Sequence, residues 1–337
     1  MPQKLILDVD TGVDDAFALA LALRCPLAEV VSVCSVFGTA SMEKTTRNTL
    51  MALRVLGMED RFRVGRGADR PMSIDPVYFP EMHGQDGLGN ASSKYPEPRP
   101  QHGSPQADNT IIEAIKAHRN QCVLVCLGPL TNVARAIKRH AEVMKTVQRI
   151  VIRGGALRVP GNLTAVAEFN FASDPLAAKT VLKSGLPITL IPLDVSQRVT
   201  FSRQEIEEAR DRDGSSTNKF LADASDMTSA YNLNMYGFHG MFAGDALAVA
   251  AALQPSLVRT FPIHVDVEAQ GEYAYGMSVA EFRKKRARGV ANCEAALEVD
   301  VDAARSFVRR HLWGLPPAAA PAPPLAGESQ VAAPKPA

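Results

Sequence analysis

Four aspartates lie within eight positions near the N-terminus: Asp8, Asp10, Asp14 and Asp15. Asp8 and Asp10 end an apolar, strand-like run, and alternation along a strand puts both on one side of the chain. Asp14 and Asp15 open a helix-like run, where simple capping at the positive end of the helix dipole explains them. Capping does not explain the first pair, because converging carboxylates raise one another's pKa unless a cation neutralises them. Oxygen ligands suit Ca²⁺ or Mg²⁺, so the stretch predicts a metal site.

Apolar, β-branched runs alternate with helical patterns along most of the chain. Strands are predicted at residues 5–8, 29–38, 122–128, 148–155 and 187–193. This alternation predicts an α/β fold with a Rossmann-like core, in which a single open, mainly parallel β-sheet is flanked by helices. Loops at the carboxyl ends of such strands form the binding crevice, which is where the aspartates belong.

Three segments interrupt this alternation. Residues 66–105 are rich in Gly and Pro, which predicts a long functional loop. Residues 214–242 mix small, polar and aromatic residues without a clean period, which favours a mobile lid. From residue 315 onward Pro and Ala dominate, so we expect a folded domain over 1–314 and a disordered tail over 315–337.

Composition excludes several classes of protein. A formal net charge of +1 gives no field that would recruit nucleic acid or an anionic membrane, and the basic run KKRAR at 284–288 is interpreted as a solvated helix face. The five cysteines form no C-x-x-C pair, which favours buried free thiols in a reducing compartment. Without a signal-peptide core or an apolar run of about 20 residues, the chain is expected to be a cytoplasmic enzyme with a small-molecule substrate.

Several motifs carry a family resemblance. DVDTGVDDAFAL (8–19) resembles the fingerprint D-x-D-x-G-x-D-D-A of the nucleoside hydrolases, the inosine–uridine-preferring ribohydrolases, and HGQDGLG (83–89) resembles their H-G-x-D-G-L-G loop. Further blocks resemble the family in its order, at 127–136, 161–178, 191–195, 244–255 and 271–279. The resemblance covers residues 4–313 and implies the nucleoside hydrolase fold, a bound Ca²⁺, and a homodimer or homotetramer.

The resemblance also implies a metal centre and a general base. Asp10, Asp15 and Asp245 and the backbone carbonyl of Leu127 would bind Ca²⁺, with helix capping as the alternative for Asp245. Cleavage of an N-glycosidic bond builds positive charge on the ribose, so carboxylates would stabilise the oxocarbenium-like transition state. Metal-bound water would lose its proton to Asp10, and we expect inversion at the anomeric carbon.

Ribose contacts are implied for four further residues. Asp14 and Asn170 would bind the 2′- and 3′-hydroxyls, and Asn162 and Glu168 the 5′-hydroxyl, although Asn162 also suits a turn. Glu168 and Asn170 share a face if their segment is extended. Tyr231 would stack on the base or fill the core of the lid.

Three positions depart from the family pattern. Thr39 stands where a ribose-binding Asn is usual, Arg153 where Met is usual, and Gly244 where many members have a His that protonates the leaving base. His239 or His83 could replace that His, although a loop His is often only solvated.

Two interpretations of Arg153 stay open. It could bind a 5′-phosphate or another anion on a modified nucleoside, or it could form a structural ion pair with Glu168. A catalytically weak, ribose-binding relative is the remaining alternative. Such a protein would have no evident need for a general base, so the presence of Asp10 favours an enzyme.

Overall fold

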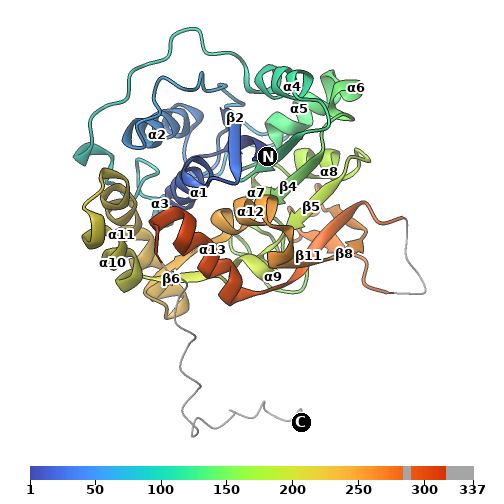
Figure 1. The fold of residues 1–337 in the computed structure, drawn as a ribbon. Coiled ribbons are helices and arrows are strands. Elements are labelled where there is room, and N and C mark those ends of the chain that lie inside the picture. The colour runs from blue at the N-terminus through green and yellow to red at the C-terminus, as the bar shows by residue number, and fades with distance from the viewer. Residues whose placement is uncertain (284–289, 316–337) are drawn as a thin grey trace, which may run out of the picture.

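The computed structural model describes residues 1–283 and 290–315 of the chain (Figure 1). The KKRAR run and all but the first residue of the predicted Pro/Ala-rich tail lie outside these ranges. No helix in the described ranges combines the length and the apolar character needed to cross a bilayer. The five cysteines are all buried and free, as the sequence predicts.

A seven-stranded sheet forms the centre of the fold, in the order β2-β1-β3-β4-β5-β11-β8 (Figure 1). Its strands are β1 (Gln3–Val9), β2 (Ala28–Ser35), β3 (Cys122–Cys126), β4 (Arg149–Arg153), β5 (Ile188–Ile191), β8 (Val258–Ile263) and β11 (Cys293–Val299). The neighbouring pairs from β2 to β11 are parallel, and β8 is antiparallel to β11 at the edge. The predicted α/β fold with a mainly parallel sheet is therefore confirmed.

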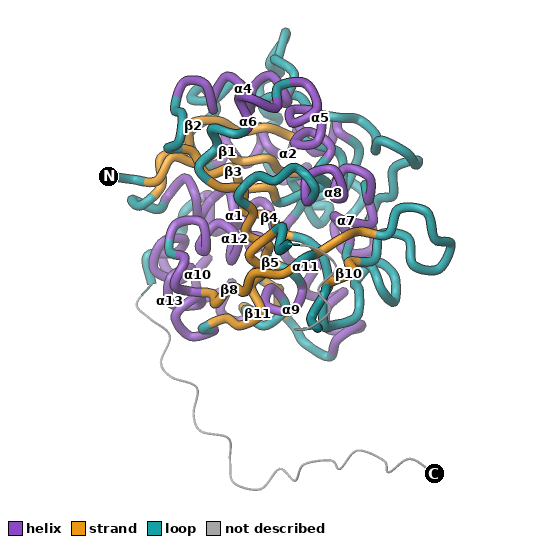
Figure 2. Tube along the Cα trace, turned by 90° about the vertical axis from the view of Figure 1, so that its right-hand side faces the viewer, coloured by secondary structure: helices purple, strands orange, loops and turns teal. Residues whose placement is uncertain are grey.

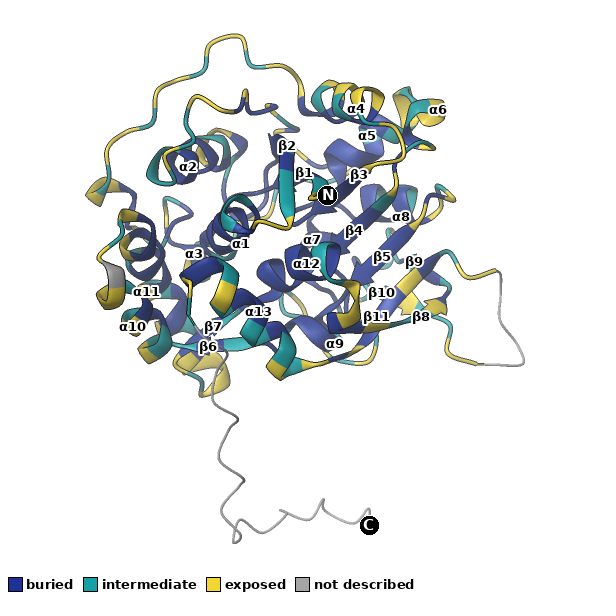
Figure 3. Cartoon of the chain, in the orientation of Figure 1, coloured by how far each residue is buried: buried dark blue, intermediate teal, exposed yellow. Residues whose placement is uncertain are grey.

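Helices cover both faces of this sheet, and the strands run between them (Figure 2). Alternate side chains of β1 enter different cores: Leu5, Leu7 and Val9 pack on one face and Ile6 on the other. The first core includes α1 (Val13–Arg24), α2 (Met42–Val55), α12 (Gly244–Leu253) and α13 (Val301–Trp313), and the second includes α4 (Ala107–Ala117), α5 (Thr131–Arg139) and α8 (Pro175–Leu182). Both faces of the central strands are buried in consequence (Figure 3).

The remaining elements are short, apart from two helices. They are α3 (Pro80–His83), α6 (Ala141–Met144), α7 (Phe169–Ser173), α9 (Leu193–Ser196), α10 (Arg203–Asp213), α11 (Ser216–Tyr236), β6 (Thr200–Ser202), β7 (Gly240–Phe242), β9 (Val265–Val267), β10 (Ser278–Ala280) and the 3-10 turns η1 (Ser92–Lys94) and η2 (Pro255–Leu257). β6 pairs with β7 and β9 with β10, each outside the main sheet.

The segment predicted as a mobile lid is dominated by α11, a helix of 21 residues that the sequence did not indicate. It is capped at its start by Ser215 and ended by Gly237 in the left-handed conformation. Its buried face consists largely of small side chains, among them Ala222, Ser225 and Ser229. Because buried serines and alanines give little hydrophobic contrast, the helical period was not visible in the sequence.

The Gly- and Pro-rich segment 66–105 is a long loop, as predicted, with α3 and η1 as its short helices. Within HGQDGLG, the Asp86 carboxylate accepts hydrogen bonds from the backbone N–H groups of Leu88, Asn90 and Ser92, at 2.7–2.9 Å. These bonds fix the segment that follows α3, and α3 delivers His83 to the edge of the sheet where the strands end.

Asn132 holds three segments together below that edge. Its Nδ2 donates to Asp8 Oδ1 at 2.7 Å and to the Ser35 carbonyl at 2.9 Å, and its Oδ1 accepts from the Ala68 N–H at 2.9 Å. Asn132 is 1% exposed, so water cannot replace these bonds. Asp8 is 1% exposed, and its carboxylate is fixed by this contact with Asn132.

We therefore expect Asn132→Ala to lower the free energy of unfolding by about 2–4 kcal/mol, because several buried polar groups lose their partner at once. Urea unfolding of the two proteins measures the difference. Asn109→Ala, at an exposed position of α4, is the control and should change stability by less than about 0.5 kcal/mol. A loss as small as the control's would contradict this role of Asn132.

Candidate active site

The carboxyl ends of β1 to β4 converge on one pocket. The strand order reverses between β1 and β3, the place where open α/β sheets form their binding crevice. Asp10 follows β1, Thr39 follows β2, Leu127 follows β3 and Arg153 ends β4. The pocket is lined by Asp10, Asp14, Asp15, Thr39, Phe79, Met82, His83, Leu127, Arg153, Asn162, Phe169, Asn170 and Asp245. It thus gathers the four predicted metal ligands and six of the other predicted site residues.

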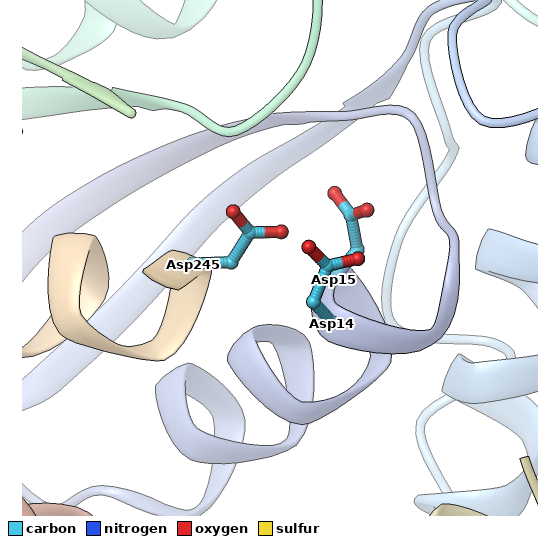
Figure 4. Close-up of side chains that lie close together, drawn as sticks. All are labelled: Asp14, Asp15 and Asp245. Atoms are coloured by element: carbon cyan, nitrogen blue, oxygen red, sulfur yellow. The ribbon is translucent and has the colours of Figure 1, made fainter. Parts of the chain in front are cut away.

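Three carboxylates form a cluster that could hold a cation (Figure 4). Asp14 and Asp15 come from the first turn of α1 and Asp245 from that of α12, and each offers an oxygen within 4.8 Å of the others. The Oδ1 atom of each is buried and has no hydrogen-bond partner. Buried oxygens without donors are costly unless a cation lies between them, so these residues fit a hard metal ion.

This cluster differs from the three expected side-chain ligands in one member. Asp14, which was expected to bind ribose, belongs to it, and Asp10 does not. Asp10 is held instead by Thr39, whose N–H donates to Asp10 Oδ2 at 2.7 Å. The Thr39 hydroxyl donates to the Asp10 backbone carbonyl at 2.5 Å, so it orients Asp10.

Two glycines make room for the Asp10 carboxylate. A Cβ atom on Gly128 would lie 2.6 Å from Asp10 Oδ1, and one on Gly38 would overlap Oδ2. The carboxylate is therefore held between two backbone segments with one oxygen fixed by Thr39. Such a group is well placed to act on a molecule in the pocket.

Burial raises the pKa of each of Asp10, Asp15 and Asp245, and neighbouring carboxylates raise it further. For Asp15 the pKa rises to about 7. Arg153 opposes these shifts with its positive charge. Without a second cation the cluster therefore retains protons close to neutral pH.

Arg153 and Glu168 form a buried ion pair, which was one of the two readings of Arg153. Arg153 Nη1 donates to Glu168 Oε1, and Arg153 Nε lies 3.3 Å from Asp245 Oδ1. Glu168 Oε2 accepts from the N–H groups of Gly155 and Phe171, at 3.0 and 3.1 Å. These contacts commit the Glu168 carboxylate to the protein itself.

The expected ribose contact of Glu168 is consequently not supported. Glu168 is 0% exposed and is not among the residues that line the pocket. The segment is not extended, since Glu168 is the N-cap of α7, and so it does not share a strand face with Asn170. Asn170 lines the pocket, and its Nδ2 donates to the carbonyls of Leu127, at 2.5 Å, and Arg153, at 3.1 Å. Asn162 Oδ1 accepts from the Phe169 N–H at 2.9 Å.

The two histidines occupy different environments. His83 is buried in the pocket, where its Nδ1 accepts from the Val13 N–H at 3.3 Å and lies 3.9 Å from Asp14 Oδ1. Burial lowers the pKa of His83, so its ring is neutral at neutral pH. His239 is exposed in the turn between α11 and β7 and lines neither this pocket nor the adjoining one. His239 is therefore not in a position to protonate a leaving base.

A second, more aromatic pocket opens from the first, and we call it the outer pocket. It shares Asp14, Phe79, Met82, Arg153 and Asn162 with the first and adds Leu193, Ser196, Gln197, Tyr231, Asn232, Tyr236, Phe242 and Gly244. Tyr231, predicted to meet the base, lies edge-on to Phe79 with ring centroids 5.5 Å apart. Phe79 also stacks on Phe169 at 6.1 Å. The walls of the outer pocket therefore offer aromatic surface of the kind on which a flat ring can stack.

Sequence reasoning missed Phe79, Met82 and Phe169. The available signal was their position, since Phe79 and Met82 directly precede HGQDGLG and Phe169 lies between two predicted ribose contacts. Aromatic residues in a Gly- and Pro-rich loop have no core of their own to fill, which favours a binding role.

Comparisons with known proteins agree with this geometry. The chain is 36% identical over 283 residues to the pyrimidine-specific ribonucleoside hydrolase RihA of an Enterobacter species, covering 84% of this chain and 89% of that protein. RihA of Salmonella typhi is 35% identical with the same coverage.

Solved structures give the same result. A purine-preferring ribonucleoside hydrolase from Gardnerella vaginalis has a TM-score of 0.86 and 32% identity over 93% of this chain and 98% of its own. A plant nucleoside hydrolase, PpNRh1, has a TM-score of 0.86 and 27% identity over 94% of this chain and 100% of its own. The family model for inosine-uridine preferring nucleoside hydrolases matches residues 5–306. The chain therefore belongs to the inosine-uridine preferring nucleoside hydrolase family, and it is an N-glycosidase that acts on nucleosides.

Proposed function

We propose that this chain hydrolyses ribonucleosides to free base and ribose with Ca²⁺ as its cofactor and Asp10 as its general base. The observation that carries the proposal is the pair of features in one pocket: an oriented Asp10 carboxylate beside buried carboxylate oxygens that lack donors. Asp15, Asp245 and the Leu127 carbonyl would hold the cation, joined by Asp10 or Asp14. Ca²⁺ suits a site built only of oxygens, because it accepts about 6–8 of them.

The cation would supply positive charge that makes a nearby water more acidic. Asp10 would accept the proton of the attacking water, since Thr39 fixes one carboxylate oxygen and leaves the group aligned with the pocket. Positive charge that develops on the ribose would be stabilised by Asp14 and the other carboxylates. With water as nucleophile, the sugar would invert at its anomeric carbon.

The base would occupy the outer pocket. Phe79 would stack on one face of the base, and Tyr231, whose ring lies 82° from that of Phe79, would meet its edge. Asn162, which lines both pockets, would lie near the sugar. His83 is neutral, so it would assist the leaving base as a hydrogen-bond donor through Nε2, because Nδ1 already accepts from Val13. The curated relatives named above act on pyrimidine nucleosides, so uridine and cytidine are the first substrates to test, followed by inosine.

The buried ion pair of Arg153 favours an unphosphorylated substrate. Its guanidinium already contacts Glu168 and Asp245, and four aspartates line the same pocket, so a 5′-phosphate would meet net negative charge. A homodimer or homotetramer in the cytoplasm remains part of the proposal.

We expect kcat/KM for uridine to exceed that for uridine 5′-monophosphate by about 100-fold or more, because the phosphate adds charge repulsion in a partly buried pocket. Release of free base, followed by chromatography, and of reducing sugar measures both reactions. Preference for the monophosphate would overturn the choice of substrate, and release of no base from uridine, cytidine or inosine would overturn the proposed hydrolysis itself.

A further inference from the structure

Arg153 lies against a carboxylate that belongs to the proposed cation site. Its Nε is 3.3 Å from Asp245 Oδ1, and both atoms are buried without a hydrogen-bond partner. The contact therefore rests on opposite charge, without the alignment of a hydrogen bond. Asp245 is at the same time one of the three clustered carboxylates (Figure 4).

Neighbouring residues hold the Arg153 guanidinium beside Asp245. Glu168 is 0% exposed and pairs with Nη1, while its other oxygen is fixed by two backbone N–H groups. Gly244 lies directly against the guanidinium, because a Cβ there would be 3.4 Å from Arg153 Nε and 3.3 Å from Ser196 Cβ. Arg153 and Gly244, two departures from the family pattern, are thus neighbours in space.

A divalent cation on Asp245 would be close to this fixed positive charge. A calcium–oxygen bond is about 2.3–2.6 Å, so an ion bound to Asp245 Oδ1 would lie no more than about 6 Å from Arg153 Nε. Like charges at that separation in a buried site repel appreciably. At the same time Arg153 stabilises the cluster when no ion is bound, since it offsets repulsion among the aspartates.

We infer that Arg153 is an internal counter-cation that competes with the divalent ion for Asp245: it stabilises the cation-free cluster and lowers the affinity of the site for calcium. This inference rests on the proposed function, because it takes the cluster to be the cation site. Arg153 acts on calcium binding through Asp245 and is in this respect a positioning residue. The Met that is usual at this position would exert no such competition.

Calcium titration of the chelator-treated, full-length protein by isothermal calorimetry tests the inference. We expect Arg153→Met to bind Ca²⁺ about tenfold or more tightly than the wild type, and its cation-free form to melt at a lower temperature. Arg153→Lys keeps the positive charge and should stay within about threefold of the wild type. Glu168→Gln removes a negative charge and leaves Arg153, so it should bind Ca²⁺ more weakly.

An Arg153→Met protein that binds Ca²⁺ no more tightly than the wild type would overturn the inference. That variant could fail to fold because Glu168 is left buried and unpaired. In that case the double variant Arg153→Met/Glu168→Gln is compared with Glu168→Gln, since the two differ only in the charge of Arg153. Equal calcium affinities of these two proteins would also overturn the inference. A wild-type protein that binds no Ca²⁺ would overturn both the inference and the proposed metal centre. A wild-type protein that binds Ca²⁺, together with an Arg153→Met protein of the same affinity, would overturn the inference alone.

Discussion

Asp10→Asn should lower kcat for uridine by about 10²–10⁴-fold, the usual contribution of a general base, while KM changes little. The amide oxygen can still accept the Thr39 N–H bond that now fixes Asp10 Oδ2, and the side chain still fits between Gly38 and Gly128. The variant therefore keeps its shape and loses the ability to accept a proton. Steady-state rates of base release, at saturating and low uridine, separate the two constants.

Asp108→Asn provides a matched control for this experiment. Asp108 is also a buried aspartate, 5% exposed, but it lies in α4 and pairs with Arg139, away from the pocket. It should leave kcat within about twofold of the wild type, whatever it does to stability. An Asp10→Asn enzyme with kcat within tenfold of the wild type would require a different base.

Removal of the cation is the second change with a large expected effect. Chelation should abolish base release, and calcium at about 100 times its Kd should restore activity and add about 2.7 kcal/mol to the free energy of unfolding. For a chain of this size that corresponds to a rise in Tm of roughly 4 °C. Scanning calorimetry and activity are measured on the same samples, and full activity after complete chelation would contradict the proposed metal centre.

The stabilisation by calcium should also depend on pH. In the cation-free protein, burial raises the pKa of Asp15 to about 7, from 3.8 for an ordinary aspartate. Between about pH 4 and 7 the folded state therefore binds more protons than the unfolded state, and the free energy of unfolding falls as pH rises. Calcium requires the ionised form, so the difference in Tm between loaded and cation-free protein should be larger at pH 8 than at pH 5. A difference that shrinks with rising pH would contradict this linkage.

The sequence was most informative about functional residues that directly follow the end of a strand. Asp10 could be placed in the crevice because parallel strands end at the same edge of a sheet, and the family resemblance added Leu127 and Arg153 at the ends of two further strands. The helical start of α12 likewise indicated that Asp245 stands at a helix terminus. These are local features combined with one topological rule.

Long-range pairings and small-residue packing were not accessible in the same way. The contact between Arg153 and Asp245 joins β4 to α12 and has no local signature. The N-cap role of Glu168 depends on α7, a helix of only five residues, which is too short for a hydrophobic period. α11 was missed because tertiary packing of Ser and Ala, and not hydrophobic contrast, makes its buried face.

The two adjoining pockets have a practical consequence for enzyme engineering. Apart from Gly244, which begins α12, the residues found only in the outer pocket come from α9, α11, β7 and the segments that border them, whereas the clustered carboxylates come from α1 and α12. A library of variants at Gln197, Tyr231 and Phe242 would therefore diversify the wall of the outer pocket without altering the aspartates. With the base bound as proposed, changes at these three positions would alter the selectivity among bases while the clustered carboxylates stay the same.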